Sequence, residues 1–465
     1  MIGDTICAPA TGTVGAAIAV VRLSGPDTFE ILQKVVDFRS PVLEGGRVKY
    51  GVIPGLDDVL VNIYKAPHSY TGEDSAEISC HCSPFIVSRI LGLLADNGAR
   101  MAGPGEFTRR AFVNGKMDLA QAEAVSDLIA SESQAQHRMA LNQLKGRYSE
   151  GLMALRDELV EISSLLELEL DFSDQDVEFA SRERLVRLLD ETLAEVEKLV
   201  ESFKLGNALR QGVPVAIVGE PNSGKSTLLN ALLGEQRAIV SDIPGTTRDT
   251  IEETLNIGGI KFRFIDTAGL RESADVIEKI GVERSFAAID KAKVVVLVVD
   301  ASSLGESDAG ALADGKSGSR NGIEKEEGRH VGRNGVEKEI RERLTADQTL
   351  IVACNKVDLS PAPSGMLGIS ALNSEGLDEL RTRICKAVDY NTDHLMVSNE
   401  RHCNALRRAA ASLRAVRRGL DAGTETDLVC IDLRNATAAL NEIFGKQIGT
   451  EDVLGEIFGR FCVGK

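Results

Sequence analysis

One segment constrains the fold of this chain more than any other: residues 219–226 match the pattern G-x-x-x-x-G-K-[ST]. The β-branched run 215–218 precedes it, and the helix-forming run 227–233 follows it. A strand, a glycine-rich turn and a helix in this order form a phosphate-binding loop, because the glycines let backbone N–H groups approach the phosphates. We therefore expect a nucleoside triphosphate site in a doubly wound α/β domain whose sheet is mostly parallel.

The loop and a second motif assign roles to particular side chains. Lys225 is expected to reach the β- and γ-phosphates, and Ser226 to bind Mg²⁺. Asp266 and Gly269 belong to a D-x-x-G motif, in which the carboxylate holds the metal and the glycine N–H meets the γ-phosphate. Thr247 precedes this motif by the spacing of a threonine that completes the magnesium shell.

A third motif predicts which base is bound. Asn355, Lys356 and Asp358 form N-K-x-D, where the carboxylate accepts two hydrogen bonds from guanine N1 and N2. Adenine lacks this donor pair, so the motif selects GTP over ATP. Ser370 and Ala371 then supply a loop whose backbone N–H can bond guanine O6. Together the motifs predict a Ras-like GTP-binding domain that hydrolyses GTP.

The residues alone leave several candidates for the groups that promote hydrolysis. After D-x-x-G comes Leu270, where Ras-like enzymes have a glutamine that orients the attacking water. Another side chain must orient the water, and the charged candidates downstream are Arg271, Glu272, Asp275 and Glu278. Asn222, inside the phosphate loop, either forms the turn or holds a monovalent cation in place of an arginine finger.

The pattern of the chain predicts its domains. Residues 1–118 alternate short strand-like runs with Gly/Pro turns and two helical patterns, which indicates an α+β domain. Residues 119–211 and 385–465 have long helical periodicity, and their apolar faces need partners. We expect one discontinuous helical domain with the G domain, 212–384, inserted in it. The Gly- and charge-rich stretch 302–344 is expected to be a mobile surface insertion, either a tolerated loop or a regulatory segment.

Composition limits the number of domains, the class of partner and the cellular location that we expect for this protein. The chain has 465 residues, of which 43% are hydrophobic and 26% charged, as in a folded protein of two to three domains. A net charge of −17 argues against a general nucleic-acid coat. No run is apolar enough to span a membrane, no signal pattern begins the chain, and the eight cysteines are scattered, so we expect a cytoplasmic protein with reduced thiols.

A local basic face is still present on one predicted helix. It is either a solvated helix surface or an RNA contact. Its members are Arg407, Arg408, Arg414, Arg417 and Arg418.

Several motifs outside the phosphate loop point to one family. They are VRLSG at 21–25, SYTGED at 69–74, PGEFT at 104–108, NGKMDLAQAE at 114–123, GTTRD at 245–249 and the terminal CVGK at 462–465. With them the chain resembles, from end to end, the MnmE (TrmE) family of tRNA-modification GTPases. The resemblance implies a homodimer through the N-terminal domains, with G domains that pair when GTP and K⁺ are bound. It also implies a FAD-dependent partner protein that joins it in a heterotetramer and helps to build a carboxymethylaminomethyl-type group on C5 of the wobble uridine of tRNA.

The same resemblance implies roles for individual residues. Glu278 orients the attacking water, and potassium is bound by Asn222 with oxygens of Ser241, Ile243 and Thr246. The implied GTP-binding set is Asn222, Ser223, Gly224, Lys225, Ser226, Thr227, Ser241, Ile243, Thr246, Thr247, Asp266, Gly269, Asn355, Lys356, Asp358, Ser370 and Ala371.

A folate site is also implied, for 5-formyltetrahydrofolate or another tetrahydrofolate derivative. Its candidate contacts are Arg22, Glu77, Lys116 and Lys465, of which the first three are, from sequence alone, ordinary salt-bridge or surface residues. Cys462 is placed near the folate, either as a thiolate nucleophile or as a buried structural cysteine. The loop 10–15 lacks the Arg- and Gly-rich form expected of many members.

Two other classes share some of these features. A ribosome-assembly GTPase would have the same G motifs but should carry an RNA-binding appendage such as a KH-like domain, and none is evident. A non-hydrolysing dimeric scaffold is disfavoured by Glu278 and by the complete magnesium set.

Overall fold

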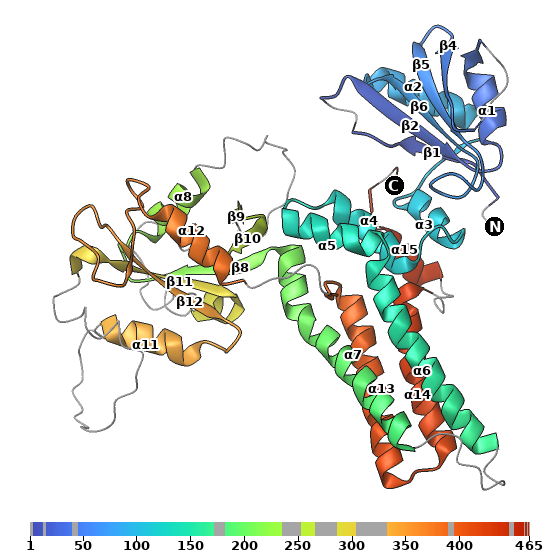
Figure 1. Ribbon diagram of the computed structural model, residues 1–465. Coiled ribbons are helices and arrows are strands. Elements are labelled where there is room, and N and C mark those ends of the chain that lie inside the picture. The colour runs from blue at the N-terminus through green and yellow to red at the C-terminus, as the bar shows by residue number, and fades with distance from the viewer. Residues whose placement is uncertain are drawn as a thin grey trace. The chain divides into compact units, whose positions relative to one another are not determined.

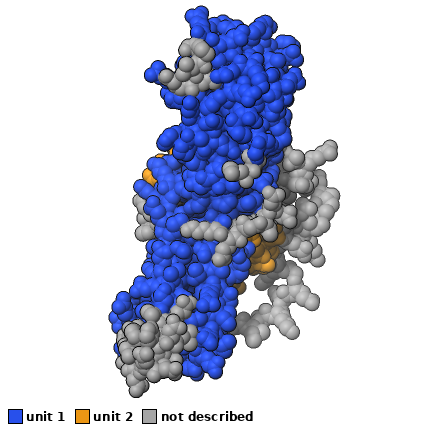
Figure 2. Space-filling view, turned by 90° about the vertical axis from the view of Figure 1, so that its right-hand side faces the viewer, with its two compact units in different colours: residues 1–130, 140–200, 401–465 blue, residues 131–139, 201–400 orange. Residues whose placement is uncertain are grey.

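The structure is a computed structural model, and the residues that it describes fall in several ranges. They are 3–12, 15–39, 45–171, 182–234, 253–265, 286–303, 333–388, 395–445, 451–459, 461, 462 and 464, without the side chains of 167–171, 182, 333–336, 451–453 and 456. Contacts divide the chain into two units, coloured separately in Figure 2. Unit 1 comprises Met1–Ala130, Ala140–Val200 and Arg401–Lys465, and unit 2 comprises Ser131–Met139 and Glu201–Glu400.

Unit 1 begins with a sheet that is antiparallel except where β1 pairs with β7. Its order in the described residues is β3-β4-β5-β6-β2-β1-β7. The strands are β1 (Ile6–Pro9), β2 (Ile18–Ser24), β3 (Asp37–Phe38), β4 (Val48–Ile53), β5 (Asp57–Tyr64), β6 (Ser75–His81) and β7 (Arg100–Met101). Helices α1 (Thr28–Val35) and α2 (Pro84–Asp96) bury one face of this sheet through Ile31, Leu32 and Ile90. This is the α+β domain that the sequence predicts.

The remainder of unit 1 is helical. Its elements are α3 (Glu106–Val113), α4 (Leu119–Ile129), α6 (Arg147–Asp171), α13 (Glu400–Ala422), α14 (Thr426–Phe444), α15 (Glu451–Gly459) and most of α7 (Arg182–Gln211). The long helices α6, α7, α13 and α14 run side by side in Figure 1 and bury leucines such as Leu159, Leu189, Leu413 and Leu440. Helices from two distant segments thus form one bundle, as their unpartnered apolar faces predict.

Unit 2 contains a six-stranded sheet in its described part, with the order β13-β12-β11-β8-β10-β9. All neighbours are parallel except β9 and β10. The strands are β8 (Val213–Val218), β9 (Glu253–Ile257), β10 (Ile260–Phe264), β11 (Val294–Asp300), β12 (Thr349–Asn355) and β13 (Leu367–Gly368). Helices α8 (Lys225–Gly234) and α12 (Leu377–Lys386) cover one face, while α11 (Arg333–Arg343) and the helical residues 286–291 cover the other (Figure 1). The predicted doubly wound sheet is confirmed.

Two stretches differ in detail from their sequence patterns. The helical pattern 119–145 is divided into α4 and α5 (Gln134–Leu144), because Ser133 Oγ accepts from Gln136 N at 3.2 Å and begins a new helix. In the stretch 302–344, residues 304–332 lie outside the described part. The end of that stretch forms α11, whose Ile340 is only 2% exposed.

Two of the sequence predictions concern the whole chain. All eight cysteines are described, and all are free thiols. Among the described residues, no helix combines the length and the apolar character that a membrane crossing requires.

Candidate functional site

The phosphate loop joins β8 to α8 in a backbone conformation that requires its glycines. Gly219 and Gly224 have φ of +151° and +94°. A Cβ on Gly219 would lie 2.3 Å from the Val298 carbonyl oxygen, and one on Gly224 would lie 2.2 Å from Asn355 Nδ2. Any side chain at either position would therefore push the loop away from β11 or β12. Asn222 has φ of +62° and is exposed at the bend between them.

Lys225 folds back over this loop. Its Nζ donates to the carbonyl oxygens of Gly219 at 3.0 Å and Glu220 at 2.8 Å. Burial lowers the pKa of the half-buried Lys225, and a cation over a loop of backbone N–H groups favours an anion there. Ser226 and Thr227 lie in the first turn of α8, where the helix N-terminus adds to the same preference.

Asn355 connects the phosphate loop with the predicted base-recognition loop. Asn355 is only 2% exposed. Its Nδ2 donates to Ser223 O at 2.9 Å, and its Oδ1 accepts from Ala371 N at 3.0 Å. One amide thereby satisfies two backbone groups from segments far apart in sequence. Ser223 itself is 1% exposed, and its Oγ meets no hydrogen-bond partner among the described residues.

The side chains of Asp358 and Lys356, the other two residues of the base motif, are held in place by polar contacts. Ser370 Oγ donates to Asp358 Oδ1 at 2.6 Å, which holds that carboxylate while leaving its second oxygen for a ligand. Lys356 Nζ lies 2.7 Å from Asp300 Oδ2. Burial alone would raise the pKa of Asp300, but hydrogen bonds from Lys356 and Ser302 lower it.

Asp300 was missed by sequence reasoning. The available signal was a carboxylate directly after the run 294–299, since strand ends of a parallel sheet gather at one edge.

The structure brings together the described members of the predicted GTP set: Asn222, Ser223, Gly224, Lys225, Ser226, Thr227, Asn355, Lys356, Asp358, Ser370 and Ala371. Outside the described residues lie Ser241, Ile243, Thr246, Thr247, Asp266, Gly269, Glu278 and Lys465.

A second group of predicted residues lies on the sheet of unit 1. Arg22 and Glu77 face each other across β2 and β6, and their side chains pair at 2.8 Å. The guanidinium carbon of Arg22 lies 5.5 Å from the ring centre of Tyr70 and 5.6 Å from that of Phe107. Lys116 Nζ donates to Pro67 O at 2.9 Å, in the loop that also carries Tyr70.

The C-terminal tail approaches the same pair. Arg22 Nη1 donates to Gly464 O at 3.4 Å, and Gly105 N donates to Cys462 O at 3.4 Å. Cys462 itself is exposed, which disagrees with the interpretation of a buried structural cysteine. Its position in the tail nevertheless places it within a few residues of the backbone that contacts Arg22.

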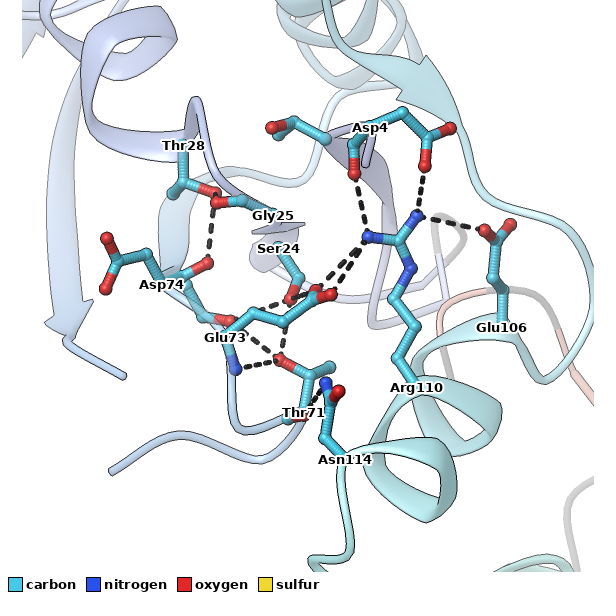
Figure 3. A network of polar contacts seen from close by, with 12 residues as sticks. Asp4, Ser24, Gly25, Thr28, Thr71, Glu73, Asp74, Glu106, Arg110 and Asn114 are labelled. Atoms are coloured by element: carbon cyan, nitrogen blue, oxygen red, sulfur yellow. Dashed lines mark hydrogen bonds and ion pairs between the residues drawn. The ribbon is translucent and has the colours of Figure 1, made fainter. Parts of the chain in front are cut away.

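Arg110 organises the motif loop 69–74 and was not anticipated from sequence. It is 1% exposed and pairs with Asp4, Glu73 and Glu106 through nitrogen–oxygen distances of 2.8, 3.2 and 3.2 Å (Figure 3). Glu73 also accepts from Ser24 Oγ at 2.8 Å, and Ser24 ends β2, the strand that carries Arg22. The spacing of Glu106 and Arg110 by one helical turn was the only local signal.

Three of the five arginines of the basic face on α13 form ion pairs within unit 1. Arg408 pairs with Glu442, Arg414 with Glu197 at 2.6 Å, and Arg417 with Asp190 at 2.8 Å. These ion pairs favour the interpretation as a solvated helix surface over an RNA contact.

Among the described residues, no three His, Cys, Asp or Glu side chains form a group that could hold a metal ion.

Comparison with known proteins decides the family. The model described as "MnmE helical domain" matches residues 119–462, and "GTP-binding protein TrmE N-terminus" matches residues 5–116. The chain belongs to the MnmE family. The proteins named tRNA modification GTPase MnmE from Porphyromonas gingivalis and Parabacteroides distasonis are 47% and 44% identical to it. These matches cover 99% of this chain, and 98% and 100% of the respective relatives.

The match to the TrmE N-terminus includes Arg22, Glu77 and Lys116 of this MnmE family member. The range matched by the MnmE helical domain contains the whole phosphate loop. Among solved structures, the FeoB G-domain from Methanococcus jannaschii covers 38% of this chain and 97% of its own. Its sequence identity is 22% and its TM-score 0.25, a likeness too slight to bear on function.

Proposed function

We propose that this protein binds and hydrolyses GTP and, with a flavoprotein partner, acts in carboxymethylaminomethyl-type modification at C5 of the wobble uridine of tRNA. The observation that carries the GTP assignment is the Asn355 amide, which ties the phosphate loop to Ala371 beside the oriented carboxylate of Asp358. Membership of a family whose relatives are named tRNA modification GTPases supports the rest.

The described residues fit GTP. The triphosphate meets the backbone N–H groups of the loop and Lys225, and Asp358 accepts from guanine N1 and N2. Magnesium would be held by the Ser226 hydroxyl, with Thr247 and Asp266 proposed as its further ligands. When bound, the ion neutralises charge that develops on the phosphates during transfer to water.

Glu278 is proposed to orient the attacking water. Asn222 is proposed to hold potassium together with Ser241, Ile243 and Thr246. The exposed amide of Asn222 at the bend of the loop is a suitable hard oxygen ligand for such a cation.

The donor set around Arg22 also fits a tetrahydrofolate. Glu77 presents a carboxylate for the N–H edge of a pterin, and Arg22 and Lys116 are cations suited to a glutamate tail. Aromatic rings of Tyr70 and Phe107 border the same place. The folate supplies a one-carbon unit, and Cys462 is proposed to take part as a thiolate near it.

A homodimer through the N-terminal sheets has support in the face of the sheet opposite α1 and α2. Val48, Tyr50, Leu60 and Ile18 are each between 41% and 62% exposed on that face. Tyr50 and Leu60 are cross-strand neighbours, and Asn62, two residues beyond Leu60, pairs with Glu77. Side chains two residues apart on a strand share a face, so the folate candidates and the open apolar residues lie on one surface.

The decisive experiment is nucleoside analysis of tRNA from cells that lack this protein. We expect wobble uridines without the carboxymethylaminomethyl-type group and restoration by the wild-type chain. A fully modified tRNA pool in the deletion strain would contradict the proposal. A defect in ribosomal particles with normal tRNA would instead indicate a ribosome-assembly GTPase.

Base selection can be tested separately with the Asp358→Asn variant. An amide there donates where a carboxylate accepts, so GTP affinity should fall about a hundredfold or more while xanthosine triphosphate, with an oxygen at C2, binds better. The matched control is Asp378→Asn, whose side chain is 97% exposed on α12. Unchanged GTP affinity in the Asp358 variant would remove the basis for guanine recognition.

A further inference from the structure

Strands β9 and β10 form a hairpin between two parts of the predicted GTP site. The two strands are antiparallel: Glu253 pairs with Phe264 at one end and Ile257 with Ile260 at the other, where Gly258 and Gly259 form the turn. In the sequence, Thr247 precedes β9 and Asp266 follows β10. Both predicted magnesium ligands therefore lie within six residues of this hairpin in the sequence.

The turn of the hairpin binds the start of α5 and the residues before it. Ala135 N donates to Gly259 O at 2.9 Å, and Asn256 Nδ2 donates to Glu132 O at 3.1 Å. Lys261 Nζ adds an ion pair to Glu132 Oε2 at 2.8 Å. Backbone, amide and charged contacts thus all join the hairpin to the segment Ser131–Met139, which belongs to unit 2.

Packing reinforces these contacts. Ala135 is 2% exposed and lies in the core of unit 2 with Ile257 and Ile260, and Met139 packs against the same core. A Cβ on Gly259 would lie 2.9 Å from Gln134 Oε1, so the turn and α5 are in close contact. The start of α5 is therefore fixed to the hairpin and would move with it.

Helix α5 is continuous, but its residues 140–144 belong to unit 1. There two glutamines join it reciprocally to α4: Gln143 Nε2 donates to Ala120 O at 2.8 Å, and Gln121 Nε2 donates to Leu144 O at 3.1 Å. Gln121 also completes the capping box with Asp118 that begins α4. Within unit 1, α4 follows directly on the segment that carries Lys116.

We propose that α5, with the preceding residues 131–133, transmits the nucleotide state of unit 2 to the start of α4 and so to the N-terminal sheet. The inference rests on the proposed GTPase function. Asn256, Lys261 and Gln143 are positioning residues in this scheme, because they touch neither the nucleotide nor the predicted folate site. A helix suits the task, since contiguous hydrogen bonds carry displacement from one end to the other.

Hydrogen exchange on the full-length protein tests the proposal, with GDP and a non-hydrolysable GTP analogue as the two ligands. In the wild type, amide exchange at residues 119–124 should differ between the ligands by about fivefold or more, the usual size of a coupling. In an Asn256→Ala, Lys261→Ala double variant the difference at 119–124 should fall at least by half, because only the Ala135–Gly259 hydrogen bond and the packing of Ala135 remain, while the difference in the hairpin is retained. Affinity for both nucleotides should stay within about twofold.

Two variants control for general damage to the hairpin. Thr254→Ala alters an exposed residue of β9, and Lys261→Arg keeps the charge that meets Glu132, so both should retain the wild-type difference. Gln143→Leu cuts the other end of the path. It should reduce the difference at 119–124 without any change in unit 2, since only the bond from Gln121 to Leu144 O remains there, and it serves as the test if the double variant binds nucleotide poorly.

The proposal is overturned if the wild type shows no difference at residues 119–124, or if the difference stays at its wild-type size in the double variant or in Gln143→Leu. Failure of the proposed function has another signature, because the wild type would then neither bind nor hydrolyse GTP. An unaltered GTP turnover with no exchange difference at α4 would therefore sink the transmission path alone.

Discussion

Replacing Glu123 by glutamine should destabilise unit 1 more than any surface substitution. The Glu123 residue of α4 is 7% exposed and accepts from Arg401 Nε at 2.9 Å and Nη2 at 3.1 Å, while His402 Nε2 lies 2.7 Å away. Arg401 also donates to Glu442 O at 2.7 Å, near the end of α14. The Tyr148 ring of α6 stacks on His402 at 5.4 Å, so the two side chains that Glu123 pairs with on α13 also contact α14 and α6.

The size of the effect follows from the pKa of Glu123. Burial alone would raise it, but His402 and then Arg401 lower it from the usual 4.5 to about 2. At 1.36 kcal/mol per unit this corresponds to about 3 kcal/mol in the free energy of unfolding, similar to other broken buried pairs. Because the folded pKa is depressed, the stabilisation is complete above pH 4.5 and is lost as the pH falls toward 2.

Urea unfolding, followed by far-UV circular dichroism and tyrosine fluorescence, measures this loss. At pH 7 the Glu123→Gln variant should be about 3 kcal/mol less stable than wild type, and the two should converge as the pH is lowered through the window between 4.5 and 2. Added GDP stabilises only the nucleotide-binding unit, which identifies the transition of unit 1.

The matched control is Glu161→Gln. Glu161 pairs with Arg184 on the surface, and the two side chains are 52% and 72% exposed, so the change should cost under about 1 kcal/mol. If Glu123→Gln is no more costly than this control, or if its deficit is the same at pH 7 and pH 3, the reasoning about the buried cluster is refuted.

Three further predictions concern the candidate sites. GTP turnover should rise about tenfold or more when K⁺ replaces Na⁺, and Asn222→Ala should abolish the difference; equal wild-type rates in both salts would exclude a potassium site. Asn355→Ala removes the hydrogen-bond partner of the buried Ser223 O and Ala371 N, so titration should show about a hundredfold weaker GTP binding. Near-normal affinity would mean that other contacts position the phosphate loop and the base-recognition loop. Arg110→Met removes the buried cation that pairs with Glu73, although Asp4 and Glu106 keep their ion pairs with Arg100, and should lower stability by about 3 kcal/mol in thermal unfolding. Lys34→Met at an exposed pair should change stability little, and equal effects of the two variants would contradict the role given to Arg110.

Much of the fold was predictable because its signals are local. The strand at Val213–Val218, the glycines of the phosphate loop and the bundle helices each follow from spacing within a few turns of chain. The clustering of the described candidate GTP residues was predictable for the same reason, since their motifs follow strands of the sheet. Neither the bridge made by Asn355 nor the pairing of Lys356 with Asp300 could be predicted, because each joins distant segments.

The sequence by itself determined the nucleotide chemistry, the helical periodicity and the family, because short-range motifs encode all three. Only the tertiary structure decided that Ser131–Met139 packs with the G-domain sheet, although its sequence pattern continues that of α4. It also decided which charges are buried together, as around Arg110 and Glu123. The physical reason is that burial and charge pairing depend on which distant elements meet, and no spacing along the chain specifies that meeting.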